Sequence, residues 1–254
     1  MEKIEVLKSK ITKLAIVGFA PTWNQAPFDD HQFEIWGLNE LYKYFEKIPN
    51  GRADRWFEIH SRNSPSKSIP QHQEWLKKCP VPLYMWEHYK DIPNSVKFPK
   101  DELIKWLGDA GGRFKDNMGN NYFTNTISWM TAFALYLGFE EIHIYGVDMA
   151  CDSEYQWQRP SCEFFLGLAK GMGVKIYLPQ NSDLLKTGQL YGFESDNQLR
   201  IKMKARIQEL QGRKKISEEE IQKAQQVIQH HTGSVNQLVG AIEDCKYWIK
   251  NWVG

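Results

Sequence analysis

Short apolar runs alternate with segments of helical spacing through most of the chain. The apolar runs are rich in β-branched and aromatic residues, which predicts strands. These strands are expected at 13–19, 33–38, 55–60, 82–86, 141–147 and 175–178. Apolar residues at helical spacing predict helices at 68–79, 101–107, 126–137 and 160–170. The alternation is typical of an α/β fold with a Rossmann-like, mostly parallel sheet flanked by helices.

The segment 87–121 interrupts this alternation with two prolines and four glycines. Long irregular insertions in compact domains commonly carry binding loops or lids. We therefore expect this segment to be a binding loop or a lid.

The chain changes character after Phe193. Residues 195–252 contain no proline and are dominated by Gln, Lys, Glu and Ile. An apolar stripe comes first, at Leu199, Met203, Ile207 and Leu210. A heptad seam with alternating spacings of three and four follows, at Ile221, Ala224, Ile228, His231, Val235, Leu238, Ile242, Cys245, Ile249 and Trp252. We expect an α/β domain at 1–193 and a coiled-coil-like α-helical hairpin at 194–254. The hairpin would bend at 212–217 and pack on itself or on a neighbouring subunit of a homo-oligomer.

Composition and charge narrow the choice of partners. The 254 residues carry a formal net charge of +1, unlike a chain that binds nucleic acid over its whole surface. No apolar run approaches the roughly 18 residues of a membrane span and no signal peptide is recognised, so we expect no membrane partner. The four cysteines lie far apart, which favours a cytoplasmic location, in the host cytoplasm if the chain is viral.

One basic stretch, at 200–215, keeps nucleic acid open as a partner. Its cations are Arg200, Lys202, Lys204, Arg206, Arg213, Lys214 and Lys215. Such a run is either a solvated helix face or an electrostatic contact with a polyanion such as DNA.

Small and polar residues follow the predicted strands. Ligands of open α/β sheets bind beyond the carboxyl ends of the strands, so these residues are site candidates. They are Gly18, Phe19, Ala20, Pro21 and Thr22 after the first strand, Asn39 after the second, His60 after the third, and Gly146 and Asp148 after the fifth. Gly18 would allow close approach of a ligand to the backbone, and Thr22 offers a hydroxyl and an amide to a phosphate.

Two further stretches carry candidate groups. Asn125, Thr126 and Ser128 stand at a helix start, where free amides bind anions. Glu154 and Arg159 lie in a charged segment after Asp148 and are candidate catalytic groups together with it.

The sequence motifs exclude several common enzyme classes. There is no P-loop, no G-x-S-x-G and no H-E-x-x-H, which removes the usual NTPase, serine hydrolase and zinc protease readings. The acidic run Asp152-Ser153-Glu154 could pass for a D-x-D metal motif, but any acidic loop produces this pattern. We assign no metal ligand.

The chain resembles the bacterial sialyltransferases with a Rossmann-like fold in three segments. These are a strand followed by GFAP, a strand followed by GLN, and the run NTISWMTAFALYLGFEEIHIYGVDM. They also resemble the broader motility-accessory and hydroxymethylpterin-pyrophosphokinase-like proteins. The matching positions are Gly18, Pro21, Thr22, Asn39, Thr126, Ser128, Leu137, Gly138, Glu141, Ile142, Gly146 and Asp148. The run SEYQWQRPSCEFF resembles uncharacterised bacteriophage proteins of this type. Ala20 replaces a family glycine, and no histidine follows Asp148 until His230, so the family's general base has no counterpart.

The resemblance implies glycosyl transfer from a nucleotide-sugar donor to a hydroxyl acceptor. The nucleotide would lie on the Gly18–Thr22 turn and Asn39, and Arg159 would stabilise the leaving phosphate. His60, Asp148 or Glu154 would replace the missing base. For a viral chain, a hydroxymethylated pyrimidine in DNA is a plausible acceptor. Two alternatives stay open: a pyrophosphokinase-like transferase that uses ATP and a divalent metal, and a non-catalytic nucleotide-binding module.

Overall fold

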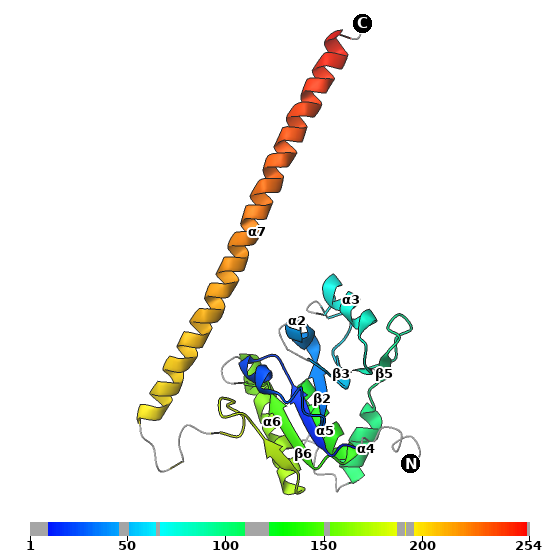
Figure 1. Ribbon diagram of the computed structural model, residues 1–254, viewed down its shortest axis with the longest axis vertical. Coiled ribbons are helices and arrows are strands. Elements are labelled where there is room, and N and C mark those ends of the chain that lie inside the picture. The colour runs from blue at the N-terminus through cyan, green and yellow to red at the C-terminus, as the bar shows by residue number, and fades with distance from the viewer. Residues whose placement is uncertain are drawn as a thin grey trace. The chain divides into compact units, whose positions relative to one another are not determined.

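The computed structural model describes residues 10–45, 51–64, 67–109, 122–149, 153–186, 191 and 196–252 (Figure 1). At 45, 109, 153–155 and 196–202 it describes the backbone alone. The chain divides into two compact units, Met1–Lys186 and Thr187–Gly254.

The first unit is built on a parallel sheet of seven strands. They are β1 (Lys13–Val17), β2 (Phe33–Leu38), β3 (Arg55–Phe57), β4 (Leu83–Met85), β5 (Ser95–Lys97), β6 (Glu141–Tyr145) and β7 (Lys175–Tyr177). Their order in the sheet is β5-β4-β3-β2-β1-β6-β7, and every pair is parallel. The predicted α/β fold with a Rossmann-like sheet is confirmed. The predicted irregular segment 87–121 contains β5, a strand of three residues that periodicity cannot detect.

Helices lie on both faces of this sheet. The helical elements are η1 (Pro21–Gln25), η2 (Asn39–Leu41), α2 (Tyr42–Phe45), α3 (Pro70–Lys78), α4 (Lys100–Asp109), α5 (Thr126–Leu137) and α6 (Ser153–Gly171). Leu14 and Ile16 of β1 face the core that α4, α5 and α6 cover. Ala15 and Val17 point to the opposite face, toward the core that includes α3, because successive side chains of a strand alternate.

The start of α6 differs from the prediction. Pro160 was expected to open a helix, but the helix begins at Ser153 and Pro160 lies inside it. The residues from Ser153 to Arg159 are mostly polar and carry no apolar period, so the sequence pattern places the start of the helix about two turns too late.

The sheet order reverses between β1 and β6. From β1 the chain moves outward through β2, β3, β4 and β5, and it then returns to pair β6 with the other side of β1. In open α/β sheets, such a switch point is where the carboxyl ends of the strands leave room for a ligand. The turns after β1, β2, β3 and β6 therefore position the candidate site.

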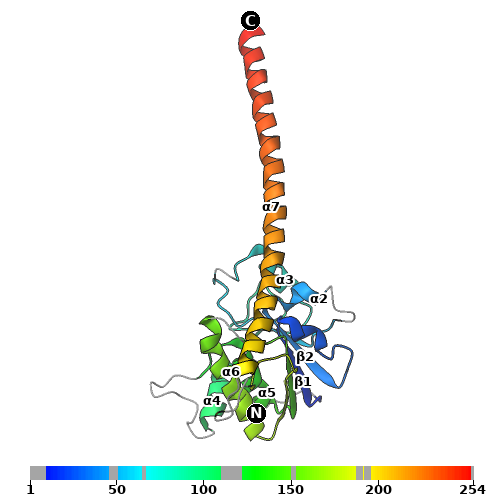
Figure 2. The same ribbon diagram turned by 90° about the vertical axis from the view of Figure 1, so that its left-hand side faces the viewer.

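The second unit contains one helix, α7 (Asp196–Trp252), of 57 residues. It runs without interruption through 212–217 in both views (Figures 1 and 2), so the predicted helical hairpin is wrong. A single glycine costs a helix only about 1 kcal/mol, and the Arg, Lys, Gln and Glu residues around Gly212 are good helix formers. Within the described residues, no helix is both long and apolar enough to cross a membrane.

Candidate functional site

The turns that follow β1 and β6 pack backbone against backbone. The amide of Gly18 donates to the carbonyl of Tyr145 at 2.8 Å, and the amide of Ala20 donates to the carbonyl of Gly146 at 2.9 Å. The amide of Gly146 donates to the hydroxyl of the buried Thr22 at 2.8 Å. These contacts use groups that the sequence assigned to a phosphate. Phe19, by contrast, is 45% exposed at the tip of the turn.

Both glycines are required by the close approach of these turns. A Cβ on Gly18 would lie 2.4 Å from the carbonyl oxygen of Gly146, and a Cβ on Gly146 would lie 2.4 Å from the carbonyl oxygen of Gly18. Gly146 also has a φ of +66°, which disfavours other residues. The contact between the turns explains the two glycines without a ligand.

Gly18→Ala is expected to destabilise the protein by about 1–3 kcal/mol, the usual range for overpacking, because its methyl group would meet backbone atoms. Urea unfolding of the purified variant measures this loss. Gly167→Ala in α6 is the control, since nothing lies within 4 Å of its added Cβ. A Gly18→Ala variant as stable as the parent chain would contradict this account of the turn.

The start of α5 is occupied by contacts within the protein. The side-chain oxygen of Asn125 accepts from the amide of Ser128 at 2.8 Å and so caps the helix. The side-chain nitrogen of Asn125 donates to the carbonyl of Gln158 at 2.8 Å. The fully buried hydroxyls of Ser128 and Ser161 share a hydrogen bond of 2.8 Å, and Thr126 is buried beside them. The structure thus uses Asn125 and Ser128 to join α5 to α6.

Arg159 also makes contacts within the protein. Its Nε donates to Glu163 at 2.9 Å, and one terminal nitrogen donates to the carbonyl of Asp183 at 2.7 Å. Arg159 thereby ties α6 to the loop after β7.

The acidic candidates lie at the carboxyl end of β6. Asp148 is half-buried just after that strand. The side chain of Glu154 and all of Asp152 fall outside the described residues. Within the described part of the chain, no group of three or more His, Cys, Asp or Glu side chains could hold a metal ion.

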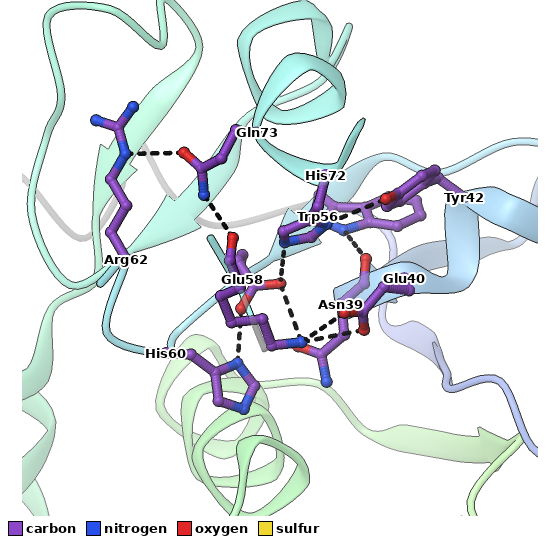
Figure 3. A network of polar contacts seen from close by, with 10 residues as sticks. Asn39, Glu40, Tyr42, Trp56, Glu58, His60, Arg62, His72 and Gln73 are labelled. Carbon is purple, nitrogen blue, oxygen red and sulfur yellow. Dashed lines mark hydrogen bonds and ion pairs between the residues drawn. The ribbon is translucent and has the colours of Figure 1, made fainter. Parts of the chain in front are cut away.

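A buried carboxylate follows β3 and contacts His60. Glu58 is 2% exposed, and one of its carboxylate oxygens lies 2.6 Å from Nδ1 of His60 (Figure 3). The two residues are two positions apart on an extended segment, so their side chains lie on the same face of the chain. The imidazole of His60 is 39% exposed, so one side of this pair is open to solvent.

The ionisation of Glu58 sets the tautomer of His60. Burial by itself raises the pKa of Glu58. The hydrogen bonds from His60 and His72 and the charge of Lys67 lower it by more than burial raises it, and the resulting pKa is about 2. The carboxylate is therefore charged at neutral pH and accepts a hydrogen bond, so Nδ1 of His60 carries the proton. Nε2 of the neutral ring is then the acceptor, as a general base requires.

Two further side chains, His72 and Lys67, lie close to Glu58, and each has a polar partner of its own. Nε2 of His72 lies 3.1 Å from the second carboxylate oxygen, and the ammonium of Lys67 lies 3.8 Å from it. Lys67 also contacts both oxygens of Glu40, at 2.9 and 3.0 Å. The hydroxyl of Tyr42 lies 3.2 Å from Nδ1 of His72. Figure 3 shows His72 on the opposite side of Glu58 from His60.

The charges of this network do not balance. It contains two carboxylates and one lysine, and both Glu58 and Lys67 are buried. With neutral histidines, the cluster carries one excess negative charge.

Asn39 lies beside this network at the carboxyl end of β2. Its backbone carbonyl accepts from the indole of Trp56 at 3.2 Å, and its φ is +50°. Its side-chain oxygen is buried and has no hydrogen-bond partner within the described residues. A buried oxygen of this kind is a natural acceptor for a ligand, because buried acceptors are nearly always satisfied.

The sequence predicted only part of this cluster. His60 and Asn39 were candidates because they follow strands, but Glu40, Glu58, Lys67 and His72 were missed. The spacing of Glu58 and His60 was a visible signal, since side chains two apart on a strand share a face. Lys67 and His72 carried no such signal, because the loop and helix that follow β3 bring them back to the strand end.

Comparisons with known proteins assign the chain to no family. No protein-family model matches the chain, and no curated protein matches it. Among solved structures, it is similar to the sialyltransferase CstII from Campylobacter jejuni in complex with cytidine-5'-monophosphate, at a TM-score of 0.45 and 16% identity over 69% of this chain and 82% of that one. It is also similar to CstII in complex with a trisaccharide acceptor and CMP, with a TM-score of 0.44 and 14% identity over 73% and 91% of the two chains. For an α-2,3-sialyltransferase from the same organism the TM-score is 0.41, at 14% identity over 70% and 78%. At these values, neither family nor substrate follows from the similarity.

Proposed function

We propose that the chain transfers a sugar from a nucleotide-sugar donor to a hydroxyl acceptor, with His60 as the general base. The observation that carries this proposal is the contact of 2.6 Å between His60 and the buried, ionised Glu58 at the carboxyl end of β3. A histidine oriented by a buried carboxylate is a standard way to deprotonate a hydroxyl group near neutral pH.

The reaction assigns one role to each group. Nε2 of His60 takes the proton of the acceptor hydroxyl as its oxygen attacks the anomeric carbon of the donor. The bond between that carbon and the phosphate oxygen breaks, and the nucleotide leaves with the electron pair. Glu58 stabilises the imidazolium that forms, as the carboxylate of a catalytic triad does.

The charges of the network favour one placement of the donor's phosphate. Glu40 and Glu58 would repel a phosphate placed next to them. We therefore place the nucleotide phosphate toward the β1–β6 switch point, with Phe19 and Asn39 on the donor side. The acceptor hydroxyl then approaches from the side of β3.

The test is transfer measured directly. The purified chain is incubated with nucleotide-sugars of each base and with hydroxyl acceptors, including oligosaccharides and DNA that contains hydroxymethylated pyrimidine, and release of the nucleotide is followed. Transfer to any acceptor supports the proposal. Binding of nucleotides without release of nucleotide from any donor would favour the non-catalytic binding module instead.

Asn39→Gly is expected to weaken nucleotide binding by about 1–3 kcal/mol, the cost of losing a buried hydrogen bond. Glycine is the appropriate replacement because it tolerates the φ of +50° at this position. Thermal shift and calorimetric titration with the mono- and diphosphates of the common nucleosides measure the change. Asn63→Gly, at an exposed turn, is the matched control. Equal affinities of Asn39→Gly and the parent chain would remove Asn39 from the donor site.

A further inference from the structure

An apolar seam runs along α7, and the described residues of the second unit provide no partner for it. Because α7 is one continuous helix, Met203, Ile207 and Leu210 of the early apolar stripe are in register with the later heptad seam. Nine of the positions whose side chains the structure describes expose more than two fifths of their surface; they are Met203, Ile207, Leu210, Ile221, Ile228, Val235, Leu238, Ile242 and Ile249. We call these positions, together with those that continue their alternate spacing of three and four, the α7 seam. A long amphipathic helix draws most of its stability from packing of such a face.

The residue types of the seam indicate the number of strands. In heptad notation, five successive a positions from residue 221 onward are β-branched: Ile221, Ile228, Val235, Ile242 and Ile249. None of the d positions is β-branched; they are Met203, Leu210, Ser217, Ala224, His231, Leu238, Cys245 and Trp252. β-branched residues at a with leucine at d, as at Leu210 and Leu238, favour two parallel strands, whereas isoleucine at d favours higher oligomers.

The polar residues of the seam indicate direction and register. Lys214 occupies an a position, and a single polar residue there specifies register. Arg213 at g and Glu218 at the following e are 66% and 59% exposed. In a parallel, in-register pair, Arg213 of each helix would face Glu218 of the other. The charges therefore complement each other across the interface of two copies.

The glycines of α7 leave the seam intact. Gly212, Gly233 and Gly240 all fall at f, the heptad position farthest from a partner helix. No atom lies within 4 Å of a Cβ added at any of them. The residues that lack a side chain thus lie outside the face that the seam would bury.

We propose that α7 pairs with the α7 of a second copy of this chain as a parallel, in-register, two-stranded coiled coil along the α7 seam. Cys245, at d and exposed, then lies opposite Cys245 of the second copy. An antiparallel pair, or one out of register, would place these two thiols far apart.

Oxidative cross-linking of the full chain tests direction and register. Cys79 and Cys162 are buried, and Cys151 is replaced by serine so that Cys245 is the reporter. Diamide, which is reduced as two thiols lose hydrogen to form a disulfide, is added to the folded protein. We expect a disulfide-linked dimer on a non-reducing gel, and its loss in a further Cys245→Ser variant.

A second pair of variants checks the register elsewhere in the seam. In the Cys151→Ser, Cys245→Ser background, His231→Cys at d is compared with Gln226→Cys at f. We expect His231→Cys to give about tenfold more linked dimer, because only residues with Cα atoms within roughly 7 Å can be bridged. Equal linking of the two variants, or no linking through Cys245, would overturn the parallel arrangement.

Light scattering of the reduced protein measures the number of chains. We expect twice the mass of the chain, falling to the mass of one chain when Leu238 and Ile242 both become lysine. Gln222→Lys with Gln226→Lys adds the same charge outside the seam and should remain a dimer. A parent chain that is monomeric, trimeric or tetrameric at micromolar concentration would overturn the proposal. A dimer that resists lysine at both Leu238 and Ile242 would do so as well.

Discussion

His60→Ala is expected to lower kcat for sugar transfer by about 10²- to 10⁴-fold, the usual contribution of a positioned base. Donor binding should change little, because His60 is placed on the acceptor side. The melting temperature should fall, because the buried carboxylate of Glu58 loses the hydrogen bond of His60. The measurement compares kcat and KM of the variant with those of the parent chain. Loss in kcat with an unchanged KM for the donor is the signature of a group that acts in the transition state.

The chain contains a matched control for this variant. His143 lies two residues after Glu141, the same spacing as the pair at 58 and 60, and contacts it through Nε2 at 2.7 Å. It lies within β6, however, and not beyond its carboxyl end. His143→Ala should therefore keep the parent's turnover. Equal activity of His60→Ala and the parent chain would exclude His60 as the base.

Glu58→Gln is expected to destabilise the protein by about 3 kcal/mol at neutral pH. The folded-state pKa of Glu58 is about 2, against 4.5 for a free glutamate, and each unit of difference corresponds to about 1.4 kcal/mol. The amide cannot replace the charge that His60, His72 and Lys67 contact on the carboxylate. Urea unfolding of both proteins measures the difference.

The pH dependence has a defined sign. The folded-state pKa of Glu58 is depressed, so its stabilisation is complete above about pH 4.5 and is lost as the pH falls toward 2. The stability gap between the parent chain and Glu58→Gln should therefore narrow over that window. Glu141→Gln, at a more exposed carboxylate, is the control. A gap that stays constant from pH 5 to pH 2.5 would contradict the ionised state assigned to Glu58.

The local sequence predicted the central elements of the fold because their signals are local. The predicted bounds of α5 agree with the structure at both ends, where Asn125 caps the first turn and Gly138 ends the helix at a φ of +87°. β2 was also predicted at its observed bounds, from a continuous apolar run buried at every position. Short β5 was missed because three residues do not complete a recognisable period.

The candidate site depended on tertiary structure to a greater extent. The sequence predicted Asn39 and His60 at strand ends because each follows an apolar run. The parallel pairing of the strands then brings those ends to the same edge of the sheet. Lys67 and His72 reach Glu58 only because the chain after β3 folds back over it, and such long-range contacts leave no periodic trace. The proximity of Gly18 and Gly146, likewise, follows from the pairing of β1 with β6.

In the C-terminal unit, the sequence by itself determined which face of the helix is apolar, since the heptad spacing is a property of neighbouring residues. Whether the chain bends at 212–217 depended on small contributions to the free energy of the helix. Gly212 and the capping residue Ser217 favour a bend, whereas the many good helix formers around them favour a continuous helix. The structure decides for one continuous helix, and this places most of the early apolar stripe in register with the later heptad seam. Periodicity thus specifies a surface, whereas only the folded backbone specifies which segments of that surface act together.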